Sequence, residues 1–315
     1  LDVAVQAAVT RGYLRASVKP EPADAFLIAV PTPFKENHEP DLSYIESAAK
    51  AIAPVLRAGN LVILESTSPV GTTEKLSEWL ALAREDLSFP HTAAADSDIL
   101  VAHCPERVLP GQVMYELAHN DRVIGGVSPR CTEAARKLYE TFVRGECVET
   151  NARTAEMCKL TENAARDVNI AFANELSLIC DGFNIDVWEL IQLANRHPRI
   201  NILQPGPGVG GHCIAVDPWF IISQAREDST LMQAARKIND QKPNWVIDKV
   251  HASVRSFLKD NPGKTVSDVT VACFGLAFKA DIDDLRESPA LQIALALSET
   301  HPGKVIGVEP NIEKL

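Results

Sequence analysis

The chain has 315 residues, 46% of them hydrophobic, and a formal net charge of −11 at neutral pH. This length accommodates two or three domains, and the apolar fraction is that of a globular protein with a sizeable core. The acidic balance argues against a surface for nucleic acid or for an anionic membrane, because both need clustered basic residues. No apolar run approaches the roughly 20 residues of a membrane span and no signal peptide is visible.

Seven cysteines are spread along the chain without any CxxC pair. The odd count and the wide spacing argue against a disulfide framework and against a zinc site, so we expect no metal. We therefore expect a reduced, cytoplasmic setting, in which a single cysteine can serve as a nucleophile.

The first 150 residues alternate apolar strands with helices, after an initial helix at 1–9 that follows no strand. Apolar runs predict strands at 25–30, 61–64, 99–103, 122–124 and 147–148, and helices at 42–56, 74–84 and 129–143. This alternation predicts a parallel sheet that is covered by helices on both faces.

Polar segments follow three of these strands: Pro31-Thr32-Pro33, Ser66-Thr67 and Cys104-Pro105-Glu106-Arg107. Ligands bind parallel sheets beyond the carboxyl ends of the strands, so the three segments would share one rim. Each segment alone is compatible with an ordinary turn, but together they favour a binding site.

The middle of the chain is expected to be all-α. The expected helices are 153–181, 187–195 and 230–258, the last interrupted at Pro243. On the first of them Lys159, Asn163 and Arg166 lie on one face. Their ammonium, amide and guanidinium donors suit an oxygen that gains negative charge in a reaction, although a solvated polar face would have the same spacing. Residues 269–275, 289–297 and 305–308 then predict a strand, a helix and a strand.

One cysteine lies in a loop of unusual composition, Gly206-Pro207-Gly208-Val209-Gly210-Gly211-His212-Cys213-Ile214-Ala215-Val216-Asp217-Pro218, which we call the glycine loop. Glycine lets the backbone take positive φ and lets another molecule approach closely. Cys213, with Asp217 four residues on, is therefore a candidate nucleophile. A glycine-rich loop with an incidental cysteine is the alternative, since an unpaired cysteine usually packs as a small hydrophobe.

A family resemblance rests on the glycine loop, on the segment Ala155-Glu156-Met157-Cys158-Lys159-Leu160-Thr161-Glu162-Asn163, and on Phe274-Gly275-Leu276-Ala277-Phe278-Lys279 with Arg286-Glu287-Ser288-Pro289. Together with the three strand-end segments, they resemble the UDP-glucose/GDP-mannose dehydrogenase family in the family's own order and along the whole chain. Residues 105–111 and 196–204 resemble the branch of the family that acts on UDP-N-acetylhexosamines.

The resemblance implies an α/β protein of three parts: an NAD-binding Rossmann domain at 1–150, a helical central dimerisation domain at 151–260, and the beginning of a second Rossmann-like, UDP-binding domain at 261–315. The N-terminal part contains neither a GxGxxG fingerprint nor an acidic partner for the cofactor ribose. We therefore expect the first βαβ portion of the NAD domain to precede residue 1, and the far half of the UDP domain to follow residue 315.

The resemblance also implies a reaction, the oxidation of a UDP-sugar C6 alcohol to a carboxylate with two NAD+ reduced, for bacterial surface polysaccharides. Cys213 is expected to hold the aldehyde as a thiohemiacetal and then as a thioester. Lys159 would take the alcohol proton or stabilise the alkoxide, with Asn163 as a second donor. Asp217 or Glu106 would act through water as the general base.

Two further sets of residues follow from the resemblance. The expected NAD contacts are Thr32, Thr67, Thr73 and Arg286. The expected sugar-nucleotide contacts are Arg107, Val108, Lys159, Asn163, Arg166, His197, Arg199, Gly210, Phe278 and Lys279.

Three other interpretations stay open. A single-hydride hydroxyacid dehydrogenase also uses a Lys-x-x-x-Asn helix, a non-catalytic protein can bind a sugar nucleotide, and the sugar can be glucose or N-acetylglucosamine. The long helix also predicts a homodimer, because its apolar side chains need cover from a second copy unless residues 200–218 fold over them. These side chains are Ile170, Phe172, Leu176 and Ile179.

Overall fold

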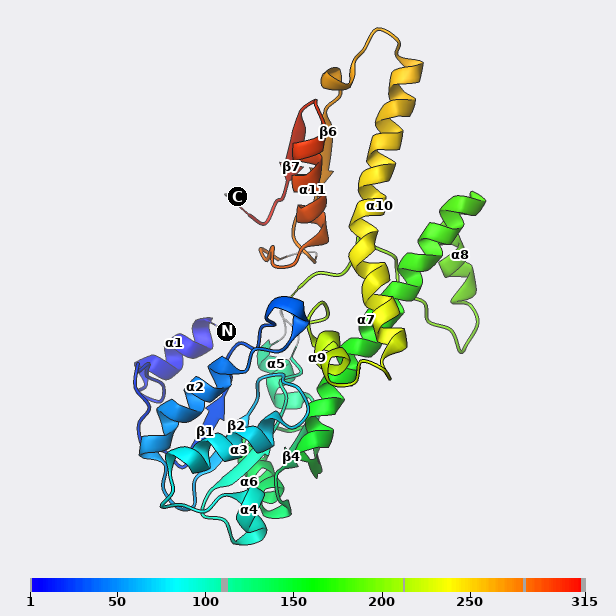
Figure 1. Ribbon diagram of the computed structural model, residues 1–315. Helices are drawn as coiled ribbons and strands as arrows, with labels where there is room; N and C mark the ends of the chain where they lie inside the picture. The colour runs from blue at the N-terminus through cyan, green and yellow to red at the C-terminus, as the bar shows by residue number, and fades with distance from the viewer. Residues whose placement is uncertain (1, 109–112, 212, 280–281, 313–315) are drawn as a thin grey trace. The chain divides into compact units, whose positions relative to one another are not determined.

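The computed structural model describes residues 2–108, 113–211, 213–279 and 282–312. The chain forms two compact units, residues 1–161 with 219–224 and residues 162–218 with 225–315. The elements of each are labelled in Figure 1. No helix in these described ranges combines the length and the apolar character that crossing a membrane requires.

The first unit is built on a five-stranded sheet of order β1-β2-β3-β4-β5. Its strands are β1 (Ala25–Ile28), β2 (Leu61–Leu64), β3 (Leu100–His103), β4 (Arg122–Gly126) and β5 (Cys147–Asn151). All five predicted strands are thus confirmed. Strands β1 to β3 are parallel to one another, as are β4 and β5.

One pairing differs from the prediction of a parallel sheet, because β4 runs antiparallel to β3. Ala102 pairs with Gly126 and His103 with Gly125. The connection through α5 (Val113–His119) does not carry the chain back over the sheet, so β4 enters from beyond the carboxyl end of β3. Residues that precede β4 are thereby brought to the rim where β1, β2 and β3 end.

Helices cover both faces of this sheet, as predicted. On one face α2 (Ser43–Ile52) and α3 (Thr72–Ala83) pack on Val62, Leu64 and Val101. On the other face α6 (Pro129–Tyr139) packs on residues that alternate with these, including Ile63 and Ala102. The remaining helical elements of this part are α1 (Asp2–Thr10), α4 (Pro90–Ala93), η1 (Glu36–His38), η2 (Ala53–Val55) and η3 (Ala94–Asp96).

Long helices dominate the second unit. They are α7 (Ala152–Phe183), whose first turns belong to the first unit, and α10 (Thr230–Asp260). The short helix α8 (Val187–Ala194) lies between them in the chain. The predicted interruption of α10 is wrong, because the helix continues through Pro243, which is buried. Proline has no N–H to donate to the carbonyl four residues earlier, which here is that of Asn239. Helix α9 (Asp217–Gln224) follows the glycine loop and had no sequence prediction.

The C-terminal residues form one βαβ unit. Strands β6 (Val271–Phe274) and β7 (Val305–Val308) pair in parallel, joined by α11 (Pro289–Thr300). Ser288 caps α11 by accepting a hydrogen bond from Leu291 N, and η4 (Val266–Asp268) precedes β6. Helix α11 packs against α10, so this unit joins the central helices through a helix–helix contact.

Candidate functional site

The ends of β1 and β2 are tied together by hydroxyl groups. Ser66 Oγ accepts a hydrogen bond from Val30 N at 2.8 Å and donates one to Val30 O at 2.7 Å. Thr32 Oγ1 donates to Thr67 O at 2.6 Å. The two strand-end segments therefore share one rim of the sheet, as their positions in the sequence predicted.

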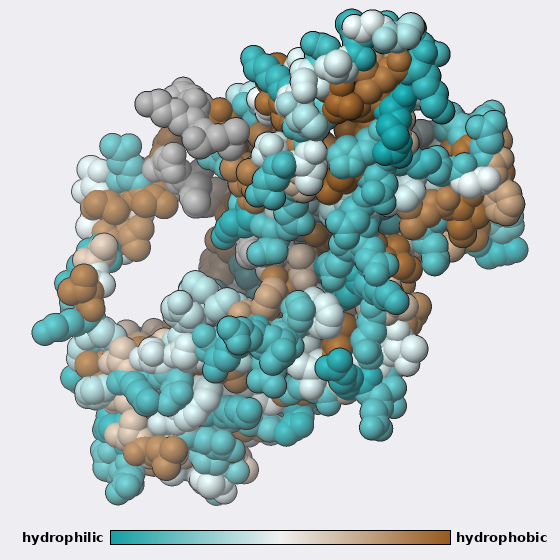
Figure 2. All heavy atoms as spheres, turned by 45° about the horizontal axis from the view of Figure 1, so that its top comes forward, coloured by the Kyte–Doolittle hydropathy of each residue, from teal (hydrophilic) through white to brown (hydrophobic). Residues whose placement is uncertain are grey.

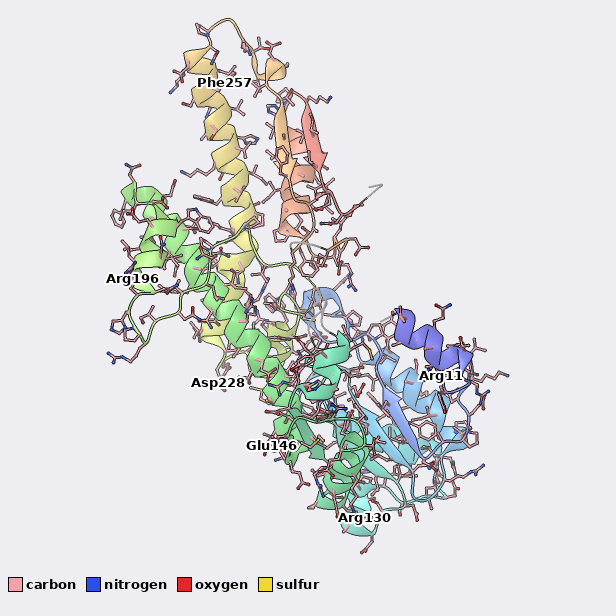
Figure 3. The ribbon with its side chains drawn as sticks, turned by 180° about the vertical axis from the view of Figure 1, so that it is seen from behind. Arg11, Arg130, Glu146, Arg196, Asp228 and Phe257 are labelled. Carbon is pink, nitrogen blue, oxygen red and sulfur yellow. The ribbon has the colours of Figure 1, made fainter. Side chains whose placement is uncertain are left out.

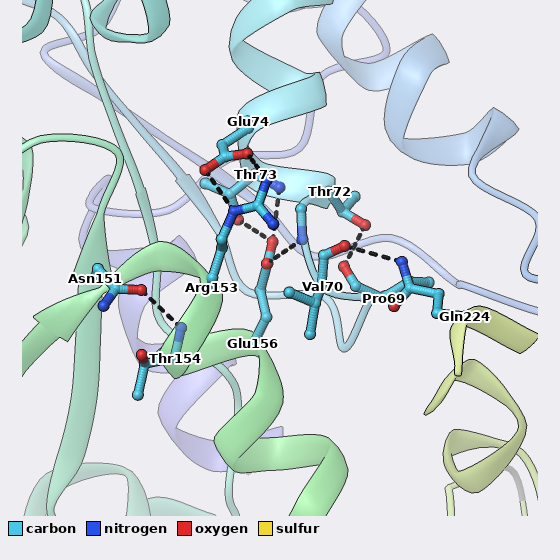
Figure 4. Close-up of polar contacts among 11 residues, drawn as sticks. Pro69, Val70, Thr72, Thr73, Glu74, Asn151, Arg153, Thr154, Glu156 and Gln224 are labelled. Carbon is cyan, nitrogen blue, oxygen red and sulfur yellow. Dashed lines mark hydrogen bonds and ion pairs between the residues drawn. The ribbon is translucent and has the colours of Figure 1, made fainter. Parts of the chain in front are cut away.

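A buried carboxylate holds the loop after β2. Glu156, in the first turns of α7, accepts hydrogen bonds from Gly71 N (2.6 Å), Thr73 N (2.7 Å) and Thr73 Oγ1 (2.6 Å). Figure 4 shows these contacts beside the Arg153–Glu74 ion pair. Burial raises the pKa of Glu156, and the three hydrogen bonds oppose that rise. The carboxylate also faces the positive end of the α3 dipole.

Thr73 therefore differs from the expected cofactor contact. Its side chain is fully buried, and its hydroxyl donates to Glu156. The residue that holds the loop after β2 is Glu156, for which the sequence predicted no role. A signal was available, because Glu156 lies three residues before Lys159 on a helix whose neighbouring positions are apolar.

Glu106, after β3, is held by three donors. Its Oε1 accepts from Arg107 N at 2.6 Å and Val108 N at 2.7 Å, and its Oε2 accepts from Arg122 Nη1 at 3.3 Å. Arg122 is 1% exposed, and extending the β3–β4 register places it opposite Glu106. The guanidinium of Arg107 donates to Asp121 O at 3.2 Å. The rest of the predicted segment, residues 109–111, lies outside the described residues.

The glycine loop is fixed to α7 on both sides of Cys213. Gly206 N donates to Asn174 Oδ1 at 2.8 Å, and Asn163 Nδ2 donates to Asp217 Oδ2 at 2.5 Å. Within the loop, Asp217 N donates to Cys213 O at 2.8 Å. Asn163 and Asp217, both predicted site residues, are thus in direct contact, and Asp217 is only 4% exposed. His212 lies outside the described residues.

The same loop packs closely on the segment before α11. Gly211 N donates to Arg286 O at 3.1 Å. A Cβ added to Gly210 would lie 2.6 Å from Glu287 O and 2.7 Å from Phe278 Cβ, and Gly211 has φ +82°. Only glycine fits this approach without displacing the neighbours. Phe278 therefore meets Gly210, and both are predicted sugar-nucleotide contacts.

Cys213 is half-buried and forms no disulfide. Arg286 has its pKa raised chiefly by a hydrogen bond to Asp284, and Cys213 contributes to the same rise, so the guanidinium lies near the thiol. Partial exposure near a cation is the environment of reactive cysteines. Cys104 contrasts with it, because burial raises the pKa of its thiol to about 12.

Lys159 lies one helical turn before Asn163 on α7 and is half-buried. Within the described residues no hydrogen bond or ion pair engages its ammonium group. Arg166, three residues after Asn163, is exposed, as is Lys279. The helix therefore presents Lys159 and Asn163 together, as predicted.

Three family models match the chain. They are the NAD binding domain (residues 1–143), the central domain (residues 153–241) and the UDP binding domain (residues 272–315) of the UDP-glucose/GDP-mannose dehydrogenase family. The chain belongs to this family. The match to its NAD binding domain makes NAD the cofactor.

Curated relatives within the family are close in sequence. A UDP-N-acetyl-D-mannosamine dehydrogenase from Yersinia pestis is 65% identical over 315 residues, covering 100% of this chain and 75% of its own. An NDP-N-acetyl-D-galactosaminuronic acid dehydrogenase from Ralstonia nicotianae (strain ATCC BAA-1114 / GMI1000) is 64% identical, covering 100% of this chain and 72% of its own. The solved structure of a UDP-D-ManNAc dehydrogenase from Pyrococcus horikoshii is 40% identical with a TM-score of 0.86, covering 98% of this chain and 71% of that one.

The rim of the first unit fits the family's cofactor. Thr67 is half-buried, and within the described ranges its hydroxyl has no hydrogen-bond partner, so it can meet a ligand. The Thr32 hydroxyl donates to Thr67 O and keeps its lone pairs as acceptors. Arg286, the fourth expected NAD contact, lies beside the glycine loop in the second unit.

Two predicted sugar-nucleotide contacts lie in the stretch between α8 and the glycine loop. His197 and Arg199 are exposed after the end of α8, and Arg199 N donates to His197 Nδ1 at 3.4 Å. Asn195 holds this stretch by two hydrogen bonds to the backbone of Ile202. Figure 3 labels Arg196 at the beginning of this stretch.

Proposed function

We propose that this enzyme oxidises UDP-N-acetyl-D-mannosamine at C6 to UDP-N-acetyl-D-mannosaminuronate. The overall change consumes the alcohol, two NAD+ and one water, and yields the carboxylate, two NADH and three protons. The observation that carries the proposal is the thiol of Cys213, held in a loop that Asn163 and Asn174 fix on either side. Membership of the family supports the cofactor and the substrate class.

The first oxidation turns the C6 alcohol into an aldehyde. NAD supplies the chemistry by accepting a hydride from C6. Lys159 is suited to the accompanying proton, because its half-buried ammonium group is not already engaged by a hydrogen bond or an ion pair within the described residues. Asn163 Nδ2, already oriented by Asp217, offers a hydrogen bond to the same oxygen.

The second oxidation needs the thiol. An aldehyde carbon cannot release a second hydride until a nucleophile adds to it, and the Cys213 thiolate can add to give a thiohemiacetal. Loss of the next hydride leaves a thioester, which water cleaves to the carboxylate and the free thiol. Asp217 or Glu106 would take the proton from that water. Asp217 lies four residues after Cys213, and its N–H donates to the Cys213 carbonyl. Glu106 already accepts hydrogen bonds from three donors, which favours Asp217 as the base.

Substitution of Cys213 tests this mechanism. In Cys213→Ser we expect a first oxidation without release of acid, because an oxygen ester is far harder to form and to cleave here than a thioester. Mass spectrometry of acid-quenched wild-type enzyme should show a substrate adduct on the peptide that contains Cys213. Cys273→Ser, which alters another half-buried cysteine, is the matched control and should keep full activity. Acid production at the wild-type rate by Cys213→Ser would overturn the proposal.

The yield of NADH separates the alternatives. Two NADH per sugar are expected here, one for a single-hydride hydroxyacid dehydrogenase, and none for a protein that only binds the sugar nucleotide. The choice of sugar is supported by the 65% identical relative and by the solved UDP-D-ManNAc dehydrogenase. The 64% identical NDP-N-acetyl-D-galactosaminuronic acid dehydrogenase makes the N-acetylgalactosamine series the second candidate. We expect kcat/KM for UDP-N-acetylmannosamine at least about tenfold above UDP-glucose and UDP-N-acetylglucosamine, a difference of about 1.4 kcal/mol.

We also propose a homodimer formed through the second unit. Phe172 and Ile179 on α7 are 50% and 47% exposed, and Ile170 and Leu176 are half-buried. Figure 2 shows further apolar surface at the side where α8 lies, whose Trp188 is 55% exposed. A two-fold contact would cover such a face with its own copy. Sedimentation of a monomer at micromolar concentration would contradict it.

We also propose a cytoplasmic location and a role in the synthesis of a bacterial surface polysaccharide. All seven cysteines lack a disulfide, which suits the reducing cytoplasm, and a uronic acid nucleotide suits the supply of a bacterial surface polysaccharide. We keep the division at 1–150, 151–260 and 261–315 as a proposal, and it is supported by the ranges of the three family models.

A further inference from the structure

Four buried polar side chains lie together between α7 and α10 in the second unit. They are Asp167, Asn174, Arg236 and Asn239, and each is at most 2% exposed. Burying polar groups costs free energy unless they are hydrogen-bonded. All four side chains make hydrogen bonds within the cluster, although Asp167 Oδ2 and Arg236 Nε have no partner in the described residues. The proposed reaction gives these four side chains no role.

The hydrogen bonds of this cluster have a fixed direction. Asp167 Oδ1 accepts from Arg236 Nη1 at 2.7 Å and from Asn239 Nδ2 at 2.8 Å. An ionised carboxylate can only accept, so Asn239 must turn its NH2 group toward Asp167. Asn239 Nδ2 also donates to the Asp167 backbone carbonyl at 3.2 Å, which requires the same orientation.

The orientation of the Asn239 amide in turn fixes the orientation of Asn174, which contacts the glycine loop. With its NH2 group committed, Asn239 presents Oδ1, which accepts from Asn174 Nδ2 at 2.9 Å. Asn174 must then present its own Oδ1 to Gly206 N, at 2.8 Å. A rotated Asn174 amide would put an NH2 group against the Gly206 N–H and an oxygen against Asn239 Oδ1. We infer that Asn174 is a positioning residue for Cys213, and that the Asp167–Arg236 ion pair sets its orientation through Asn239.

The loop depends on such contacts, because its described residues from 206 to 216 form turns and irregular backbone without a helix or strand. Asn163 holds it at Asp217, and Asn174 holds it at Gly206. Loss of the Gly206 contact therefore lets the loop shift relative to α7. The inference rests on the proposed role of Cys213 as the nucleophile.

The test uses the whole enzyme and four variants, Asn174→Ala, Asn239→Ala, their double substitution, and the control Asn169→Ala. Asn169 is exposed on the same helix and donates only to Ala165 O within it. We expect Asn174→Ala to lower kcat at least about fivefold with KM for both substrates within about twofold, since one directed hydrogen bond is lost. Asn239 acts through Asn174, so the double variant should have the kcat of Asn174→Ala alone. Asn169→Ala should match the wild type.

Several outcomes would overturn the inference. They are a wild-type kcat in Asn174→Ala, a loss of kcat that follows a fall in the population of folded protein, and additive losses in the double variant. If Asn174→Ala does not fold, Asn174→Ser, which leaves a smaller void, is measured in its place. The proposed function has a separate test. It would be contradicted if Cys213→Ser released acid at the wild-type rate, and this result does not depend on the asparagine variants.

Discussion

Substitution of Gly210 by alanine tests how closely the glycine loop must pack. The added Cβ would lie 2.6 Å from Glu287 O, 2.7 Å from Phe278 Cβ and 2.9 Å from Pro289 Cδ. A backbone oxygen, a Cβ and a proline ring cannot be moved by rotating a side chain. Glu287 also has φ +50°, a strained value for a residue with a side chain, so its backbone has little freedom to shift.

The magnitude follows from the number of these contacts. Overpacking a well-packed site costs about 1–3 kcal/mol, and three rigid contacts below 3.0 Å place Gly210→Ala at the upper end, about 3 kcal/mol. Urea unfolding of the whole enzyme measures this loss, and steady-state kinetics measure kcat beside it. If the loop moves away instead of destabilising the fold, stability is kept and kcat falls at least about tenfold, because Cys213 moves with the loop.

Gly206→Ala is the matched control in the same loop. Its added Cβ would meet nothing closer than Gly208 O at 3.8 Å, and its N–H to Asn174 is unaffected. We expect its free energy of unfolding to stay within about 0.5 kcal/mol of wild type. Indistinguishable stability and kcat for both alanine variants would refute the reasoning that close contact with Phe278 and Pro289 sets the loop.

Two further predictions concern single side chains of the first unit. Burial lowers the pKa of His103 to about 3, whereas the pKa of a histidine in the unfolded chain is about 6.5. Between these two pH values the unfolded chain binds a proton that the folded state does not bind. The free energy of unfolding should fall by about 2 kcal/mol from pH 7 to pH 5 through this residue, and urea unfolding of His103→Leu should lack that part of the pH dependence; an unchanged dependence would count against it. Lys159→Ala should lose kcat far more than it raises KM, because the ammonium group acts mainly on the charged transition state. A normal kcat with weaker binding would show instead that Lys159 binds ground and transition states equally.

Local patterns were sufficient to predict most elements of the fold. Apolar runs such as 61–64 predicted buried strands because strands covered on both faces need no polar positions. The β3–β4 direction was not predictable, since it depends on how the 104–121 connection returns to the sheet. Pro243 was misinterpreted because tertiary packing can hold a helix through a proline that an isolated helix would not tolerate.

The candidate site was predictable where its chemistry is local. The Lys159–Asn163 spacing and the Cys213–Asp217 loop each lie within one segment, so the side chains could be named from the sequence. Arg122 and Glu156 could not, because their partners are set by strand register and by packing between α7 and α3. His197 and Arg199 stay predictions, in a stretch that Asn195 holds through the backbone of Ile202.

Replacing the proline inside α10 would improve the helix but disturb the contact between the helix and the glycine loop. Because Pro243 has no N–H, the Asn239 carbonyl lacks its partner in the helical ladder, and it lies 3.2 Å from where a Cβ on Gly208 would stand. Pro243→Ala gains about 3 kcal/mol of helix propensity. The new N–H would also draw that carbonyl back into the helix and away from the loop. A screen for melting temperature alone would therefore select a change that loosens the surroundings of the nucleophile.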